Sequence, residues 1–366
     1  MKSLGVTRDL SDRMGGLFDL VRRDAVRLFG SDPASIEVLS LEVRESSEVA
    51  RARVTTPTGV RHVFAKILKP RVPGETGLEE TRLRLRHDVE VTRHVFEAMG
   101  STDDLRAVEP LACYEEALGI VTNEAPGLPL DVVVGRAARW PARPGDLESL
   151  ENTFARIGRW IAAFQQVAPE PTPSRLDLDA TREYIDTRLK RLVDLAGAGF
   201  EEADRRAVLA YFDARAAHVQ SIDRLAVPVH GDITPSNIIV QSQSVTVLDF
   251  AMTARGSKYL DLARLYSQLE FYTAKPQYRP HVIARLQRAL LSGFDPSLLT
   301  DNPLFELCAL QHVVCHFLSH ARRPGTFPIS LYSRHLCRLH RRWLVERSRS
   351  VGVRHLTAAP ASGSSR

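Results

Sequence analysis

Five segments in the first third of the chain are short, rich in β-branched residues and bounded by turn residues, which is the pattern of β-strands. They lie at 35–43, 49–55, 60–68, 108–114 and 119–122. The turn Pro57-Thr58-Gly59 joins the second segment to the third, so we expect an antiparallel hairpin there. The pattern predicts a small antiparallel sheet near the N-terminal end.

Apolar residues recur at the spacing of amphipathic helices through most of the remaining chain. The predicted helices are 9–29, 79–99, 147–167, 180–195, 201–222, 257–269, 278–292, 303–321 and 331–348. Strands come first and helices afterwards, so we expect an α+β protein with two lobes. The small lobe contains the sheet and a helix, and the larger lobe is mainly helical.

Composition suggests where these lobes begin and end. We expect an N-terminal lobe at 1–122 and a hinge at 123–130, where Pro126 and Gly127 mark a linker. A C-terminal lobe should follow at 131–350. The stretch 351–366 is rich in Ala, Ser and Gly, and we expect it to be disordered.

The candidate chemistry lies between His230 and Asp249. Asp232 follows His230-Gly231 directly and could take a proton from a hydroxyl, and Asn237 stands five positions further on. The short apolar runs 238–240 and 245–248 predict a hairpin that brings Asp249 back beside Asn237. Both side chains offer hard oxygen ligands, which suit Mg²⁺. This ordered set indicates a phosphoryl-transfer centre.

The segment resembles the aminoglycoside phosphotransferase and choline kinase family, small-molecule relatives of the protein kinases that carry His-Gly-Asp where protein kinases carry His-Arg-Asp. The resemblance implies a protein-kinase-like fold and the use of ATP and Mg²⁺. It implies that 1–122 is a nucleotide-binding lobe and that 131–350 is a catalytic and acceptor lobe. It implies Asp232 as the catalytic base, and we count His230 with it. It also implies Asn237 and Asp249 as Mg²⁺ ligands, and Asp261 as a brace of the catalytic loop.

A lysine in the predicted sheet is the candidate for contacting the ATP phosphates. Lys66 stands among apolar neighbours in 63–68, and the chain has only six Lys against 43 Arg. A lysine that snorkels to water from an edge strand is the alternative. On the following helix, Glu90 is our first choice as its acidic partner. A glutamate that pairs with a neighbour on the exposed face of the helix would look the same in the sequence.

The rest of the nucleotide site has weaker signals. The turn at 44–48 has no glycine, so Ser46 and Ser47 are the candidates for cradling phosphate. There is no Walker A sequence. At the hinge, the resemblance implies that the backbone of Asn123, Glu124 and Ala125 reads adenine. An ordinary interdomain loop there would look the same.

Charge and composition limit the partners. The net charge is +5, yet residues 322–366 hold ten Arg and one acid, Glu346. The end of the chain could dock an anion or could be a solvated helix face. Aromatic residues do not interleave with its arginines, which argues against nucleic acid. No apolar run approaches 18 residues and no signal-peptide core precedes Met14, so we expect a soluble cytoplasmic protein.

The acceptor has no diagnostic motif. Only Glu306 and Glu346 are acids between 303 and 349, which argues against a polycationic antibiotic, and we favour a neutral or anionic, sugar-like hydroxyl compound. An aminoglycoside or other antibiotic kinase, a choline-type kinase, a protein Ser/Thr kinase and a catalytically silent binding module are the alternatives.

Cys308, His312, Cys315 and His316 share one predicted helix, and we expect them to pack in the core or to line the acceptor pocket rather than to bind zinc, because the two cysteines stand about two turns apart. Four scattered cysteines also predict reduced thiols rather than a disulfide framework.

Overall fold

The computed structural model describes residues 12–44, 46–100, 103–141, 143–167, 174–195, 197–322 and 329–357, with the side chains of 331–349 in the last segment. The chain divides into two compact units. Unit 1 comprises Met1–Val133, Gln166–Pro169 and His230–Ala254, and unit 2 comprises Val134–Gln165, Glu170–Val229 and Arg255–Arg366. The first boundary therefore falls at Val133 rather than within 123–130, and the candidate catalytic segment belongs with the N-terminal strands.

A five-stranded antiparallel sheet forms the body of unit 1. Its order is β1 (Ser35–Val43), β2 (Ser47–Thr56), β3 (Gly59–Leu68), β6 (Gly119–Asn123) and β5 (Pro110–Tyr114). The strands coincide with the five predicted segments to within two residues at each end. The β-branched residues and the Thr56–Gly59 turn therefore specify this sheet locally.

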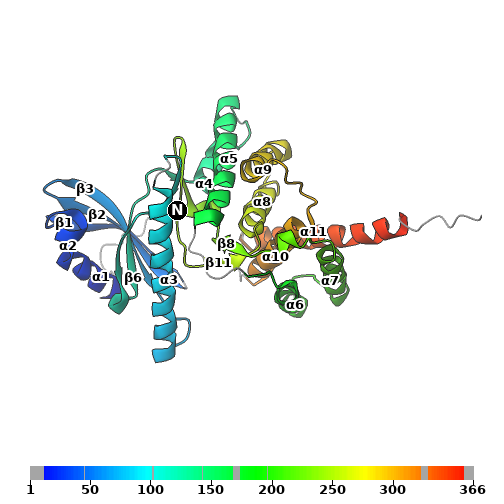
Figure 1. The fold of residues 1–366 in the computed structure, drawn as a ribbon, viewed down its shortest axis with the longest axis horizontal. Coiled ribbons are helices and arrows are strands. Elements are labelled where there is room, and N and C mark those ends of the chain that lie inside the picture. Colours follow the sequence, from blue (N-terminus) through cyan, green and yellow to red (C-terminus); the bar gives the residue numbers. More distant parts are fainter. Residues whose placement is uncertain are drawn as a thin grey trace, which may run out of the picture. The chain divides into compact units, whose positions relative to one another are not determined.

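Helices cover both faces of this sheet (Figure 1). Helices α1 (Asp12–Arg23) and α2 (Ala25–Phe29) pack on one face against alternating small residues such as Ala50, Ala52 and Ala65. On the other face, α3 (Glu75–Met99) places Leu85 and Val89 against Leu68 and Ile120. Because side chains alternate along β3, Lys66 points to the α3 face, opposite to its neighbours.

Two predicted helices of unit 1 have different bounds from those expected. The single helix expected at 9–29 is two helices, interrupted at Asp24. Helix α3 begins at Glu75 and contains an extra turn before the expected start at 79.

A second sheet of unit 1 contains the candidate hairpin. Its order is β4 (Leu105–Ala107), β10 (Ser244–Val247), β9 (Ile238–Gln241) and β7 (Leu128–Pro129). Strand β10 pairs in parallel with β4, and β9 pairs with β7. The imidazole Nε2 of His87 on α3 also lies 2.9 Å from the backbone oxygen of Thr253. These contacts explain why His230–Ala254 belongs to unit 1.

Unit 2 is built around one apolar helix. Its helices are α5 (Pro144–Val167), α6 (Leu178–Asp194), α7 (Glu202–Ala216), α8 (Leu260–Tyr272), α9 (Pro280–Phe294), α10 (Pro303–Ala321) and α11 (Ile329–Thr357), and α4 (Leu130–Ala137) crosses the boundary at Val133. Helix α10 packs against α6, α7, α8 and α11. It buries residues on all sides, among them Leu310, Val313 and Phe317, as expected of a core helix.

Short elements complete the description of the chain. They are the 3₁₀ turns at Glu115–Ala117, Ile222–Arg224 and Pro235–Asn237, and a two-stranded sheet of β8 (Val227–Val229) and β11 (Ala254–Gly256). Helix α7 ends at Ala216, six residues before the expected end. Helix α11 continues to Thr357, so the expectation of disorder from 351 is wrong up to that residue, and 358–366 lie outside the described residues. In the part of the chain that the structure describes, we find no helix with the length and apolarity needed to span a bilayer.

Candidate active site

The catalytic turn is built on a glycine that no other residue could replace without movement. Gly231 has φ +75°, a left-handed conformation, and a Cβ there would lie 2.4 Å from the backbone oxygen of Met252. This close approach of two backbone segments sets the position of Asp232, the next residue. The Gly of His-Gly-Asp is therefore a packing requirement of this turn.

His230 holds the same turn from inside the protein. Its ring is fully buried, its Nε2 lies 3.0 Å from the backbone oxygen of Leu248, and its Nδ1 accepts the backbone N–H of Asp232 at 3.2 Å. These two contacts assign the proton to Nε2. These two contacts hold the turn that carries Asp232, and the assignment of His230 as a catalytic residue stays a prediction.

The β9–β10 hairpin brings the two expected metal ligands together. The backbone N–H of Leu248 donates to the oxygen of Asn237 at 2.9 Å, so Asp249 follows directly beside Asn237. The Asn237 carboxamide donates through Nδ2 to the backbone oxygen and to Oδ2 of Asp232, at 3.0 and 3.3 Å. This orientation leaves Oδ1 of Asn237 as an acceptor. Asp249 has φ +64°, which Asp tolerates better than most residues and which is common at functional sites.

Lys66 connects two carboxylates that are distant in sequence. Its Nζ lies 2.7 Å from Oδ1 of Asp249, 183 residues away, and 3.8 Å from Oδ2 of Asp88 on α3. The structure thus brings Lys66, Asn237, Asp232 and Asp249 together within unit 1, as the sequence predicts.

The acidic partner of Lys66 on α3 is Asp88, and the prediction of Glu90 is wrong. Glu90 is exposed, whereas the Asp88 side chain is only 4% exposed. The buried face of α3 includes Leu85, Asp88 and Thr92, at spacings of three and four residues, and Glu90 lies out of phase with it. This periodicity was the signal that could have identified Asp88.

The two carboxylates beside Lys66 differ in their electrostatics. Burial raises the pKa of Asp88 to about 6, although the charge of Lys66 opposes this shift. Burial also raises the pKa of Asp249, but attraction to Lys66 and a hydrogen bond from it outweigh burial, and the net pKa is lowered. Asp249 is therefore held as an anion, which is the form that a metal ligand requires.

The oxygen atoms of this site fit Mg²⁺. Oδ1 of Asn237 and the ionised carboxylate of Asp249 are adjacent hard ligands from one hairpin. Among the described residues no cluster of three or more His, Cys, Asp or Glu side chains could hold a metal ion. A pair of protein ligands is nevertheless what Mg²⁺ at a phosphoryl-transfer site requires, because water and phosphate oxygens complete its octahedron.

At the expected adenine site, strand pairing already uses two of the three backbone N–H groups. The N–H of Asn123 donates to the oxygen of Glu109 at 3.0 Å, and the N–H of Glu124 donates to the oxygen of His62 at 2.9 Å. The Glu124 carboxylate binds Arg51. Ala125 has no backbone hydrogen bond among those of the described residues, so its N–H is available, and the reading of adenine by this backbone stays a prediction.

The turn between β1 and β2 is not a phosphate loop of the usual kind. Ser46 is exposed and its backbone oxygen accepts the N–H of Lys69, while Ser47 is buried in β2 and its oxygen accepts the N–H of Arg44. Of the two serines, only Ser46 presents its side chain to solvent. Asp261, the expected brace, is buried in the first turn of α8 in unit 2, and its role remains a prediction.

The Cys and His side chains of α10 point to different neighbours. Cys308 donates to the hydroxyl of Ser257 at 3.1 Å, and Cys315 lies 3.5 Å from the hydroxyl of Tyr184. His316 stacks on Phe271 at a centroid distance of 4.6 Å. These side chains therefore pack in the interior of unit 2 with separate partners.

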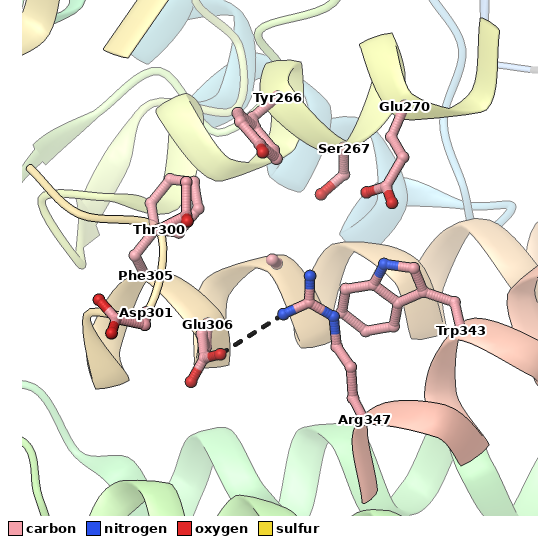
Figure 2. A pocket seen from close by; sticks show the side chains of 10 residues that line it. Tyr266, Ser267, Glu270, Thr300, Asp301, Phe305, Glu306, Trp343 and Arg347 are labelled. Carbon is pink, nitrogen blue, oxygen red and sulfur yellow. Dashed lines mark hydrogen bonds and ion pairs between the residues drawn. The ribbon is translucent and has the colours of Figure 1, made fainter. Parts of the chain in front are cut away.

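Unit 2 also contains a polar pocket of about 130 Å³ between α8, α10 and α11 (Figure 2). Glu306 is paired there with Arg215 and with Arg347, the latter at 3.4 Å. Glu270 points into the same space from α8, and burial raises its pKa although Arg347 and the indole of Trp343 oppose the shift. No sequence motif marks this pocket, because its residues come from three helices far apart in the chain.

Comparison with known proteins identifies the family of the chain. The sequence profile described as the phosphotransferase enzyme family matches residues 93–299, which is more than half of the chain. The chain therefore belongs to the phosphotransferase enzyme family, as the His-Gly-Asp segment predicts. No curated protein sequence matches it.

Solved structures confirm the fold. The chain is similar to a thermostable mutant of aminoglycoside phosphotransferase APH(4)-Ia in a ternary complex with ADP and hygromycin B, with a TM-score of 0.54, 15% identity and coverage of 88% of this chain and 98% of that one. It is also similar to a choline/ethanolamine kinase family protein from Mesorhizobium loti, with a TM-score of 0.53, 14% identity and coverage of 91% and 97%. A choline kinase from Cryptosporidium parvum Iowa II gives a TM-score of 0.53, 11% identity and coverage of 93% and 97%. The α+β, protein-kinase-like fold is thus confirmed.

Proposed function

We propose that this chain transfers the γ-phosphoryl group of ATP to a hydroxyl group of a small molecule. The observation that carries the proposal is the bridge from Lys66 to Asp88 and Asp249, because it unites three elements of a kinase nucleotide site. The family of the chain supports a phosphotransferase, and similar structures include complexes with ADP and with a non-hydrolysable ATP analogue.

Asp232 is the proposed general base. The acceptor oxygen would form a bond to the γ-phosphorus while the bond to the β–γ bridging oxygen breaks, ADP leaves, and the hydroxyl proton passes to the Asp232 carboxylate. Asn237 donates to Oδ2 of Asp232 and restricts that carboxylate, and His230 fixes the backbone of the same turn. Their contribution is alignment of the base with the acceptor.

Asn237 and Asp249 are the residues that would hold Mg²⁺. When bound, the ion would supply positive charge next to the β- and γ-phosphates. Asp88 keeps Lys66 on the same face of the sheet, where its ammonium can bind the α- and β-phosphates.

The acceptor that we favour is a neutral or anionic, sugar-like hydroxyl compound. Of the two acids between 303 and 349, Glu306 is buried and paired with Arg215 and Arg347, so it is not left to bind the ammonium groups of a polycation. Glu346 is exposed and lies 3.7 Å from Arg342, so a single exposed acid remains. This pairing supports the preference that the composition of 303–349 suggests.

The aromatic residues of unit 2 also argue against a choline-type acceptor. A cage for a quaternary ammonium needs free aromatic faces. Instead, the guanidinium of Arg347 lies 4.3 Å from the ring centroid of Trp343, and the ammonium of Lys275 lies 4.8 Å from that of Tyr272. Phe271 stacks on His316. The protein's own cations and imidazoles occupy these rings.

A transfer assay tests the proposal. Purified protein would be incubated with Mg-ATP and a panel of sugars, polyols, amino alcohols and antibiotics, and ADP release would be measured. We expect Asp232→Asn to lower kcat by about 10²–10⁴-fold while the Mg-ATP thermal shift remains, because a general base is lost and the nucleotide contacts are not. Asp103→Asn, an exposed acid of the same unit, is the control. Wild-type turnover by Asp232→Asn would remove Asp232 from the mechanism.

A further inference from the structure

Helix α3 carries three closely spaced arginines, and only one of them has no acidic partner. Arg82 pairs with Glu79 and with Glu75, and Arg86 pairs with Glu115 at 2.6 Å. Arg84, between them, makes no ion pair or side-chain hydrogen bond within the described part of the chain, and it is half-buried. An arginine in this state is available to bind an anion.

A second unpaired arginine lies in the loop that packs on the same helix. A Cβ at Gly77 would lie 1.8 Å from the backbone oxygen of Val72, so the loop after β3 presses directly on α3. Arg71 is the residue before this contact, and it too has no acidic partner among the described residues. The tight contact at Gly77 fixes where the loop, and with it Arg71, meets the helix.

Arg84 lies on the same face of α3 as Asp88, the residue that reaches Lys66. Gly77, Arg84 and Asp88 follow each other at intervals of seven and four residues, which places them on one helix face. Asp88 at the end of that row reaches Lys66, which in turn contacts Asp249. The row therefore leads from the loop of Arg71, past Arg84, to the lysine.

The electrostatics of Arg84 agree with this placement. Burial lowers the pKa of its guanidinium and the like charge of Arg71 lowers it further, while Asp88 and Asp249 oppose both effects. Arg84 is thus close enough to Arg71 to be repelled by it and close enough to the two carboxylates to be attracted. Two like charges held near each other favour binding of an anion that neutralises both.

The turn that usually cradles phosphate is poorly equipped for it in this chain. It has no glycine, and Glu48 within it is buried and pairs with Lys69 at 3.7 Å. Without glycine, the turn lacks the residue that best allows a phosphate to approach the backbone closely. Cationic side chains elsewhere in unit 1 are therefore the candidates for neutralising phosphate charge.

We propose that Arg71 and Arg84 form a side-chain subsite for the terminal phosphates of the nucleotide, in place of a glycine-rich loop. The proposal rests on the proposed function. Guanidinium groups bind phosphate oxygens through paired, charge-assisted hydrogen bonds, which suits a site without a glycine-rich loop. The subsite discriminates nucleotides by the number of phosphates and not by the base.

The test compares four arginine variants of the full chain. Arg84→Met and Arg71→Met remove the subsite, whereas Arg82→Met and Arg86→Met remove neighbours that are paired on the surface. Binding of a non-hydrolysable ATP analogue, ADP and AMP, each with Mg²⁺, would be measured by titration calorimetry. We expect the first two variants to weaken the ATP analogue about tenfold or more, ADP less, and AMP not at all. The two control variants should bind all three like the wild type.

Stability separates this role from a structural one. Because Arg84 is repelled by Arg71 and partly desolvated, Arg84→Met should leave the Tm of the nucleotide-free protein unchanged or raise it, and Arg84→Lys should recover part of the ATP affinity. The inference would be overturned if both variants weakened binding of the ATP analogue, ADP and AMP equally. It would also be overturned if Arg84→Met and the exposed Arg71→Met both had a lower nucleotide-free Tm, because the two residues would then serve folding. An unchanged ratio of ATP to AMP affinity in both variants would also overturn it.

Failure of the proposed function gives a different result. If the wild type binds none of the three nucleotides, the kinase proposal and the inference fall together. If the wild type prefers the ATP analogue to AMP and Arg84→Met retains that preference, only the inference falls.

Discussion

The two carboxylates beside Lys66 in the candidate active site of unit 1 have pKa values shifted in opposite directions, whereas Glu270 and Glu306 in the polar pocket of unit 2 are shifted in the same direction. In unit 1, Lys66 holds the pKa of Asp249 below its usual value in spite of burial. In unit 2, burial raises the pKa of Glu270 and of Glu306, although Arg347 opposes both shifts. The difference shows that acids and cations gathered in one place do not by themselves make a reactive site.

The two regions also differ in what remains for a ligand. In unit 2, Arg215 and Arg347 already surround the Glu306 carboxylate. In unit 1, one ammonium group serves two carboxylates, and Arg84 has no acidic partner of its own among the described residues. The candidate active site thus keeps a cation that pairs with no acid among the described residues, whereas the Glu306 carboxylate of the pocket is paired with two arginines.

The largest expected difference between the regions is the response to Mg-ATP. Asp249→Ala should abolish the Mg²⁺-dependent part of the Mg-ATP thermal shift, because Asn237 alone is a neutral ligand. Glu270→Gln should retain the full shift. Differential scanning fluorimetry with and without Mg²⁺ measures both variants, and a full shift in Asp249→Ala would show that the metal is held elsewhere.

A smaller effect is expected at the α3 end of the lysine bridge. Asp88→Asn should weaken Mg-ATP binding about tenfold by releasing Lys66 from one carboxylate, and Glu90→Gln should leave it unchanged. Because the pKa of Asp88 is about 6, wild-type affinity should also fall below pH 6 as that carboxylate takes up a proton. The variant should lack this part of the pH dependence. Equal effects of the two substitutions would return Glu90 to the mechanism.

The smallest effect concerns the stability of the pocket. The folded-state pKa of Glu270 is raised, so the folded protein loses stability as pH rises through its unfolded and then its folded pKa. Glu270→Gln should remove that loss. The Tm of the variant should therefore exceed that of the wild type at pH 8, and by more than at pH 5. Glu306→Gln should instead lower Tm, because Arg215 and Arg347 lose a buried partner. A Tm difference for Glu270→Gln that does not change with pH would contradict this account.

Local signals were sufficient for the sheet and for most of the active site. The strands around Lys66 follow from β-branched residues and turns, which act over a few residues. The hairpin between Asn237 and Asp249 is similarly local, and its geometry brings the two ligands together without help from distant contacts. The family resemblance supplied the roles of these residues.

Features that depend on tertiary contacts were not predicted. Asp88 lies in phase with the apolar positions of α3, but only the packing of that face on Leu68 and Ile120 shows that a carboxylate there turns toward Lys66. The parallel pairing of β4 with β10 assigns the hairpin to unit 1, and a three-residue strand carries almost no sequence signal. The pocket of unit 2 combines side chains from three helices, so no single segment could reveal it.

The β9–β10 hairpin has a consequence for engineering. Its open end carries Asn237 and Asp249, and its closed end is the exposed turn at Ser242 and Gln243, four strand residues away. At roughly 3.3 Å per residue, the turn lies about 13 Å from the ligands along the strands. A fluorophore or a short peptide tag inserted there would remain attached to the catalytic framework without entering it. The turn is therefore a suitable position for a reporter that follows nucleotide binding in solution.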